Sequence, residues 1–316
     1  MPQQPLIIAA PDFVHEFMDE SPIRCLAYAP KTGILATGDG NGQLRFYDGE
    51  DFLFDVDCRP DTNKGRNELT LRLLSFCPSG DLLYCANGNE IVAVSVQSGQ
   101  VFWTFKPNKL FALLLSTPLG LAAIDDYHVV ASFSCGQMVV LDRQGRVIRR
   151  HFENDAPQSM VYMERNDLIV GVDGFKTLTW RSHDLGTSKP EIVYEGRAYS
   201  VAGHRKGTRF AIRIPGGFNV FDTVNPDWTM TIPCGAGLPH ALVSEDGTWL
   251  VHTEENALIA HNLNNRYTEK LRFDDVPTSL IQGEDSNTII AGFRSGEVNT
   301  ISLEVKGSPT PPPMTS

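Results

Sequence analysis

The chain has 316 residues, enough for one large domain or two of ordinary size. Hydrophobic residues make up 41% and charged residues 21%, which excludes an intrinsically disordered or coiled-coil protein. The 27 basic and 38 acidic residues give a net charge of −11, which argues against general binding to nucleic acid or to an anionic membrane. The composition therefore indicates a folded globular protein that needs neither metal nor disulfide to stabilise it.

The sequence also bears on the compartment. No apolar run approaches the 18 or so residues of a transmembrane helix, and residues 1–11 have neither the basic start nor the apolar core of a secretory signal. No two of the six cysteines form a C-x-x-C pair, so we expect reduced structural thiols. We expect a cytoplasmic protein with no membrane contact, while a nuclear location stays open.

In chain order, the sequence reads as short β-rich runs separated by turn residues, with almost no helix signal. Some runs are nearly continuously apolar and must be covered on both faces: residues 71–76, 91–96, 112–115 and 138–141. Residues 267–273 instead alternate apolar and polar, as in a strand with one face in water. A propeller blade needs both kinds, because its inner strands lie between neighbouring blades and its outer strand lies on the rim.

Three features recur along the chain, which indicates internal repeats. Four strands begin after a proline, at Pro22, Pro157, Pro239 and Pro277. Tight turns recur at Gly42, Gly88, Gly136, Gly174, Gly217, Asn256 and Gly296. The strand after each turn ends at 47–48, 95–96, 141–142, 180–181, 221–222, 261–262 or 301–302, and successive endings are 39 to 48 residues apart. Seven repeats of a little over 40 residues fill the chain.

Residues 23–48 resemble one WD40 repeat, with Tyr47-Asp48 in the place of the Trp-Asp dipeptide. Leu141-Asp142 and Phe221-Asp222 resemble that dipeptide more weakly. No repeat ends in Trp-Asp, and Gly203-His204 lies between the first two strands of its repeat. The resemblance covers residues 5–304. It implies an all-β, seven-bladed β-propeller over residues 1–304, followed by a Pro-rich tail at 305–316 that includes a P-x-x-P spacing.

The register predicts how the ring closes. Residues 15–26 align without gaps with residues 270–281, so residues 12–18 correspond to an outer strand. The last repeat lacks an outer strand of its own. We therefore expect the amino-terminal strand to complete the seventh blade.

Residues able to carry catalysis or hold a metal form no assembled set. The adjacent acids Asp125-Asp126, Glu254-Glu255 and Asp274-Asp275 are expected to be solvated turn residues. None of the eight histidines has a zinc-ligand spacing; His252 and His261 lie on paired strands but are not expected to oppose each other directly. Phosphate loops and nucleophile elbows are absent from the sequence. We predict no catalytic, cofactor-binding or metal-binding residues.

The resemblance to WD40 repeats implies a non-catalytic scaffold for protein–protein interaction, a subunit or adaptor in a larger complex, with no implied homo-oligomer and no cofactor. The alternative is a propeller enzyme, a lactonase or glycoside-processing hydrolase, with its site at the mouth of the channel. A basic cluster (Arg143, Arg146, Arg149, Arg150, His151) is expected on an outer strand, where charge protects a sheet edge.

The predicted partner-binding residues share one face of the ring. Hairpin turns supply four of them, and a polar insertion at residues 58–68 supplies three more. They are Asn41, Asp173, Phe175 and Arg294, and Asp61, Lys64 and Arg66. An exposed aromatic residue and several arginines are typical of protein interfaces. The long connection at residues 182–191 is expected on the opposite face.

Overall fold

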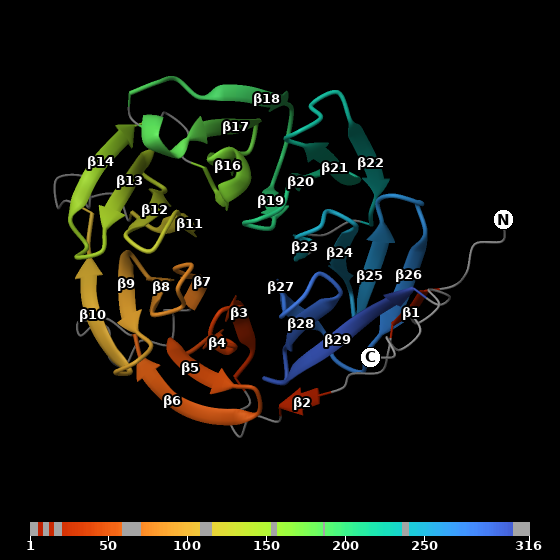
Figure 1. The fold of residues 1–316 in the computed structure, drawn as a ribbon, viewed down its shortest axis with the longest axis horizontal. Helices are drawn as coiled ribbons and strands as arrows, with labels where there is room; N and C mark the ends of the chain where they lie inside the picture. Colours follow the sequence, from red (N-terminus) through yellow and green to blue (C-terminus); the bar gives the residue numbers. More distant parts are fainter. Residues whose placement is uncertain are drawn as a thin grey trace, which may run out of the picture.

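The computed structural model describes residues 6–8, 13–15, 21–58, 71–107, 116–152, 157–185, 187–235 and 240–305. These residues form seven antiparallel sheets, arranged as the blades of a ring (Figure 1). The prediction of an all-β, seven-bladed β-propeller is confirmed.

Four strands make up each of the first six blades, and the described strands follow one another from the centre to the rim. The innermost strands are β3 (Ile23–Ala29), β7 (Leu71–Phe76), β11 (Pro118–Ala123), β15 (Ser159–Met163), β19 (Ser200–Gly203), β23 (Ala241–Val243) and β27 (Pro277–Gln282). The second strands are β4 (Ile34–Asp39), β8 (Leu82–Asn87), β12 (His128–Phe133), β16 (Leu168–Val172), β20 (Arg209–Ile214), β24 (Trp249–Glu254) and β28 (Thr288–Phe293). The third strands are β5 (Gln43–Asp48), β9 (Glu90–Ser95), β13 (Gln137–Asp142), β17 (Lys176–Arg181), β21 (Gly217–Asp222), β25 (Ala257–Asn262) and β29 (Val298–Val305). The outer strands are β6 (Asp51–Asp57), β10 (Gln100–Phe105), β14 (Val147–Phe152), β18 (Glu191–Glu195), β22 (Thr229–Pro233) and β26 (Thr268–Arg272).

The two hydrophobicity patterns occupy the predicted layers. Strands β9 and β13 are buried along nearly their whole length, because a neighbouring blade covers each of their faces. Strand β26 alternates between exposed and half-buried residues, as a rim strand should. The apolar run at residues 112–115 lies outside the described residues, and the innermost strand of blade 3 is β11, which follows it.

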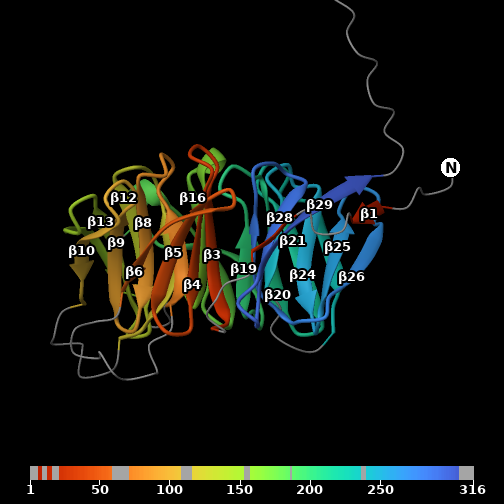
Figure 2. The ribbon, with the colours of Figure 1, turned by 90° about the horizontal axis from the view of Figure 1, so that it is seen from below.

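The strand directions divide the loops between two faces, seen edge-on in Figure 2. The turns between second and third strands share one face with the connections from each blade to the next; we call it the hairpin face. The turns between first and second strands, and between third and fourth, lie on the other, the channel face. The 3₁₀ turn at Ser182–Asp184 follows β17 and lies on the channel face, opposite the hairpins, as expected.

The last blade contains both ends of the described chain. Strand β29 pairs with β28 on one side and, on the other, with β2 (Phe13–His15) and β1 (Leu6–Ile8). The predicted closure of the ring by an amino-terminal strand is therefore confirmed. The additional pairing of β1 with residues 303–305 was not predicted.

Candidate functional site

The structure places four of the seven predicted partner-binding residues, and all four lie on the hairpin face. Asn41 and Arg294 are on hairpins of the adjacent blades 1 and 7, whereas Asp173 and Phe175 are on blade 4, across the ring (Figure 1). Asp61, Lys64 and Arg66 lie outside the described residues. The described candidates therefore share a face without forming one cluster.

The hairpin that carries Phe175 is held by local hydrogen bonds. Asp173 is buried, and its carboxylate accepts hydrogen bonds from the main-chain N–H groups of Phe175 (2.8 Å) and Lys176 (2.7 Å). Gly174 has a φ of +101°, a conformation that a residue with a Cβ adopts only with strain. Asp173 thus shapes the turn and offers little surface to a partner, which differs from its predicted role. Phe175 is 70% exposed.

The connection from blade 4 to blade 5 extends this surface. The main-chain N–H of Gly196 donates to the carbonyl of Phe175 (2.9 Å), and that of Ala198 donates to Gly174 (3.2 Å). The exposed Arg197 stacks over the ring of Tyr199, with 5.7 Å between guanidinium carbon and ring centroid. The sequence analysis did not identify Arg197 and Tyr199 as candidates. Their position in a connection between two blades, on the same face as the hairpins, could have indicated them.

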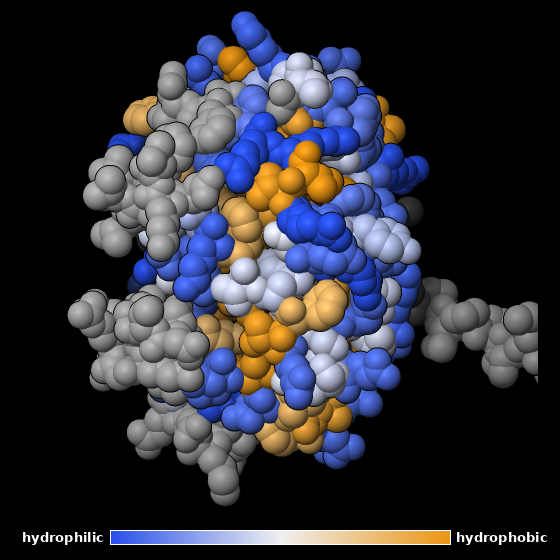
Figure 3. Space-filling view, turned by 90° about the vertical axis from the view of Figure 1, so that its left-hand side faces the viewer, coloured by the Kyte–Doolittle hydropathy of each residue, from blue (hydrophilic) through white to orange (hydrophobic). Residues whose placement is uncertain are grey.

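A belt of exposed apolar side chains runs along the rim of blades 1 to 4. In each of these outer strands the register shifts by one residue, so one residue bulges out of the pairing. The four bulged residues are all exposed and apolar: Leu53, Phe102, Ile148 and Val193. Figure 3 shows apolar side chains reaching the surface between polar ones on the side of the ring where β10 and β14 lie. We call these four residues the apolar belt.

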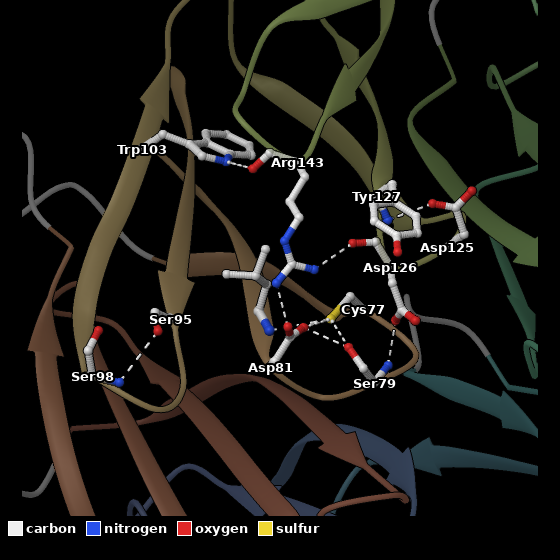
Figure 4. Close-up of polar contacts among 11 residues, drawn as sticks. Cys77, Ser79, Asp81, Ser95, Ser98, Trp103, Asp125, Asp126, Tyr127 and Arg143 are labelled. Carbon is white, nitrogen blue, oxygen red and sulfur yellow. Dashed lines mark hydrogen bonds and ion pairs between the residues drawn. The ribbon is translucent and has the colours of Figure 1, made fainter.

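The acidic pair Asp125-Asp126 belongs to a polar network between blades 2 and 3 on the channel face (Figure 4). Asp126 accepts a hydrogen bond from the main-chain N–H of Ser79 (2.6 Å), and its own carbonyl accepts one from Arg143 (3.0 Å). Asp125 accepts one from the main-chain N–H of Tyr127 (2.7 Å). The two carboxylates thus have different partners and act as turn and inter-blade acceptors.

Arg143 belongs to the predicted basic cluster, but it lies in the turn before β14 rather than on the strand. Its guanidinium pairs with Asp81, which also accepts hydrogen bonds from Cys77 (2.9 Å) and Ser79 (2.6 Å). Burial opposes ionisation of Asp81, but the hydrogen bonds, led by that of Arg143, outweigh it and lower its pKa to about 2. Burial and the Asp81 contact raise the pKa of the Cys77 thiol. A thiol with a raised pKa is a poor nucleophile, so the network joins blades and does not activate Cys77.

The two histidines of blade 6 do touch each other. His252 pairs in register with Ile259, so the histidines are not directly opposed, as expected. Their rings nevertheless stack diagonally, with centroids 5.2 Å apart and the Nε2 atoms 3.1 Å apart. Burial lowers the pKa of both, that of His261 to about 4. The pair is a partly buried contact that the sequence spacing did not reveal.

The innermost strands enclose a central cavity of about 450 Å³. Its lining comes from all seven innermost strands and from the turns that follow four of them, those of blades 1, 2, 4 and 5, so the cavity opens on the channel face. Leu74, Leu121, Met160, Val201 and Leu280 are among its apolar lining residues. Basic and acidic side chains occur only at the mouth.

Arg205 is the most extensively bonded residue at this mouth. It donates to the main-chain oxygens of Ala123 (2.8 Å) and Ile124 in blade 3, and to the carboxylate of Glu164 (2.9 Å) in blade 4. Its guanidinium lies over the ring of Tyr162, 5.1 Å from the centroid. Arg205 is therefore fixed in place and joins three blades.

Within the part of the chain that the structure describes, no three His, Cys, Asp or Glu side chains lie close enough to hold a metal ion. The described residues also include no α-helix of the length and apolarity that crossing a lipid bilayer requires. The seven-bladed propeller is consistent with a WD40-like fold. No protein-family model matches the chain, and no curated protein is similar to it at a significant level.

Proposed function

We propose that this protein is a divergent WD40-type propeller that acts as a non-catalytic scaffold, a cytoplasmic subunit or adaptor that binds other proteins on its hairpin face. The observation that carries the proposal is the exposure of Phe175 on a hairpin that hydrogen bonds hold rigid. Covering an exposed phenyl ring removes apolar surface from water and so favours binding, and a main chain that is already held in place loses little conformational entropy when the partner binds.

The surroundings of Phe175 support this choice of face. Arg197 and Tyr199 belong to the residue types that dominate the binding energy of protein interfaces, and they lie on the connection bonded to the Phe175 hairpin. Among the described residues, the most exposed aromatic residue of the channel face is Tyr127, at 63%. Its hydroxyl can stay hydrated, so its exposure costs less than that of Phe175. The apolar belt is a second surface of the kind that marks interaction sites.

The test is quantitative affinity purification from the native host, followed by mass spectrometry, with matched variants. Phe175→Ala should reduce recovery of the specific partners by about tenfold or more. Tyr127→Ala, an equal truncation on the other face, should leave recovery unchanged. Both variants should melt within a few degrees of wild type, because surface substitutions cost under about 0.5 kcal/mol.

Three results would contradict the proposal. The first is partner recovery that is insensitive to Phe175→Ala. The second is recovery lost with Phe102→Ser alone, which would move the docking surface to the apolar belt. The third is turnover of a lactone, glycoside or ester by the purified protein, which would favour an enzyme.

A further inference from the structure

Two of the six cysteines bring their sulfur atoms into contact across the boundary between two blades. Cys58 directly follows β6, the outer strand of blade 1, and Cys85 lies in β8, the second strand of blade 2. Their Sγ atoms are 3.8 Å apart, although the two residues are 27 positions apart in the sequence. The S–S bond of a disulfide is about 2.0 Å long, so the sulfur atoms need to approach each other by about 1.8 Å.

The main chain holds Cys58 against the strand that carries Cys85. The N–H of Cys58 donates a hydrogen bond to the carbonyl oxygen of Gly42 in its own blade (3.1 Å). The carbonyl oxygen of Cys58 accepts one from the side-chain amide of Asn87 (2.5 Å), which lies two residues after Cys85 on β8. Blade 2 therefore fixes Cys58 and presents Cys85 to it from the same strand.

The two cysteines differ in accessibility and in protonation. Cys58 is 5% exposed, whereas Cys85 is fully buried. The thiol of Cys85 donates a weak hydrogen bond to Cys58 Sγ, and this bond together with burial raises the pKa of Cys85. Because the thiolate is the reactive form of cysteine, Cys85 stays a protonated thiol and Cys58 is the sulfur that an oxidant meets first.

A third thiol, Cys25, belongs to the same apolar cluster between blades 1 and 2. Its Sγ contacts the carbonyl oxygen of Gly38 in its own blade (3.9 Å), and burial raises its pKa. Cys25 is therefore directed to its own blade, and the contact that crosses the blade boundary is the one between Cys58 and Cys85.

We propose that Cys58 and Cys85 form a redox-sensitive site, which a peroxide converts into a disulfide that joins blades 1 and 2. Hydrogen peroxide transfers one oxygen atom to Cys58, which becomes a sulfenic acid while one water molecule leaves. The sulfur of Cys85 then attacks the sulfur of Cys58, the S–O bond breaks, and the hydroxyl group leaves with the thiol proton as a second water molecule. The two thiols lose two electrons in total, which the O–O bond of the peroxide takes up.

The disulfide would tie the end of an outer strand to the second strand of the next blade. It closes the chain between residues 58 and 85 into a covalent loop, which restricts the unfolded chain and so stabilises the fold. The oxidised protein should therefore melt a few degrees above the reduced protein. The site lies between blades 1 and 2, and is separate from protein docking at Phe175 in blade 4.

The test treats the purified full chain with hydrogen peroxide, blocks the remaining thiols with N-ethylmaleimide under denaturing conditions, and maps cross-linked peptides by mass spectrometry. Trypsin is combined with a protease that cleaves before aspartate, because Asp81 separates Cys77 from Cys85 in the sequence. Wild type should give a peptide that links Cys58 to Cys85. The melting temperature should rise by a few degrees, and dithiothreitol should reverse both changes.

Matched variants assign the effect to the pair. Cys58→Ala and Cys85→Ala should each abolish the cross-link and the peroxide-dependent rise in melting temperature. Cys25→Ala, which removes the neighbouring thiol, and Cys135→Ala, which removes a half-buried thiol of blade 3, should retain both. If a variant fails to fold, the peptide map of the wild type still decides.

Three results would overturn the proposal. The first is a wild-type peptide map without the Cys58–Cys85 link after peroxide treatment. The second is a link from Cys58 to Cys25 in place of the link to Cys85. The third is a cross-linked protein that melts at the same temperature as the reduced protein.

Discussion

Arg205 of blade 5 donates a hydrogen bond of 2.8 Å to the main-chain oxygen of Ala123 in blade 3, and so spans the whole of blade 4. Neighbouring blades of a propeller ordinarily meet through side chains packed between adjacent sheets. Arg205 instead joins two blades that share no sheet face, and it bonds to the intervening blade through Glu164 on the way.

Removing this link should lower stability. Arg205→Met keeps the apolar stem but leaves the carbonyls of Ala123 and Ile124 without their donor, at a cost of about 2 kcal/mol. Arg205→Lys should restore little, because an ammonium group cannot reproduce the planar fork of the guanidinium. Urea denaturation measures both effects. Arg165→Met, at an exposed position next to Glu164, is the control and should leave the stability unchanged.

The His252–His261 pair predicts a loss of stability in mild acid. Burial, and for His261 also the neighbouring His252, lowers both pKa values in the folded state, that of His261 from 6.5 to about 4. The unfolded chain therefore binds protons first, and stability falls as pH drops below about 6.5 and continues to fall toward pH 4. The partial exposure of His261 keeps the loss below the nominal 1.4 kcal/mol per pKa unit.

The measurement is the melting temperature between about pH 7 and pH 5 for wild type and His261→Gln. The variant should lose less stability over this range. Cys234, Glu254, Arg213 and Lys270 also face the pair, and His261→Gln leaves all four in place, so they act on both proteins. Parallel curves for the two proteins would contradict the prediction.

Asp81 and Arg143 should be energetically coupled. The carboxylate of Asp81 is ionised above pH 3.8 whether the chain is folded or unfolded, so its contribution is fully present at neutral pH and is lost as pH falls toward about 2. In a double-mutant cycle at pH 7, Asp81→Asn and Arg143→Met should show a coupling of about 1 kcal/mol, since both side chains are partly exposed. Additive effects in urea denaturation would mean that the contact contributes nothing.

Deleting residues 1–18 should destabilise the whole ring. The deletion removes both strands that pair with the outer side of β29, and each lost main-chain hydrogen bond costs about 0.5–1.5 kcal/mol. The loss is a large part of a typical domain stability of about 5–15 kcal/mol. Calorimetry should show a clearly lower melting temperature. Deletion of residues 307–316 is the control and should leave the melting temperature unchanged. Equal melting temperatures for the two truncated proteins would refute the closure argument.

The architecture could be predicted from the sequence because its determinants are local. The turn at Gly174 needs a positive φ, and Asp173 next to it supplies the acceptor for two main-chain N–H groups. Strand β13 is apolar throughout because neighbouring blades cover both of its faces. Such signals recur in each repeat, so they fix blade number and register even without a family match.

The contacts that distinguish this chain from a generic propeller could not be predicted. Arg205 reaches two blades away through a long side chain, and the sequence does not encode that direction in any spacing. His252 and His261 meet on a diagonal that depends on rotamers. The bulges that expose Leu53 and Phe102 interrupt the strand pairing, whereas an alternating sequence pattern predicts only regular pairing. Each of these depends on tertiary geometry.

The pairing of β1 and β2 with β29 also has a consequence for biosynthesis. Because β29 begins at residue 298 and β2 ends at residue 15, β1 and β2 wait for a partner strand that is made 283 residues later. At 5–20 residues per second, that delay is roughly 15–60 s. Blades 1 to 6 can fold outside the ribosome during this time, while the amino-terminal strands remain unpaired and accessible to chaperones. The ring can close only after β29 has left the exit tunnel, so completion of the fold waits for the synthesis of β29.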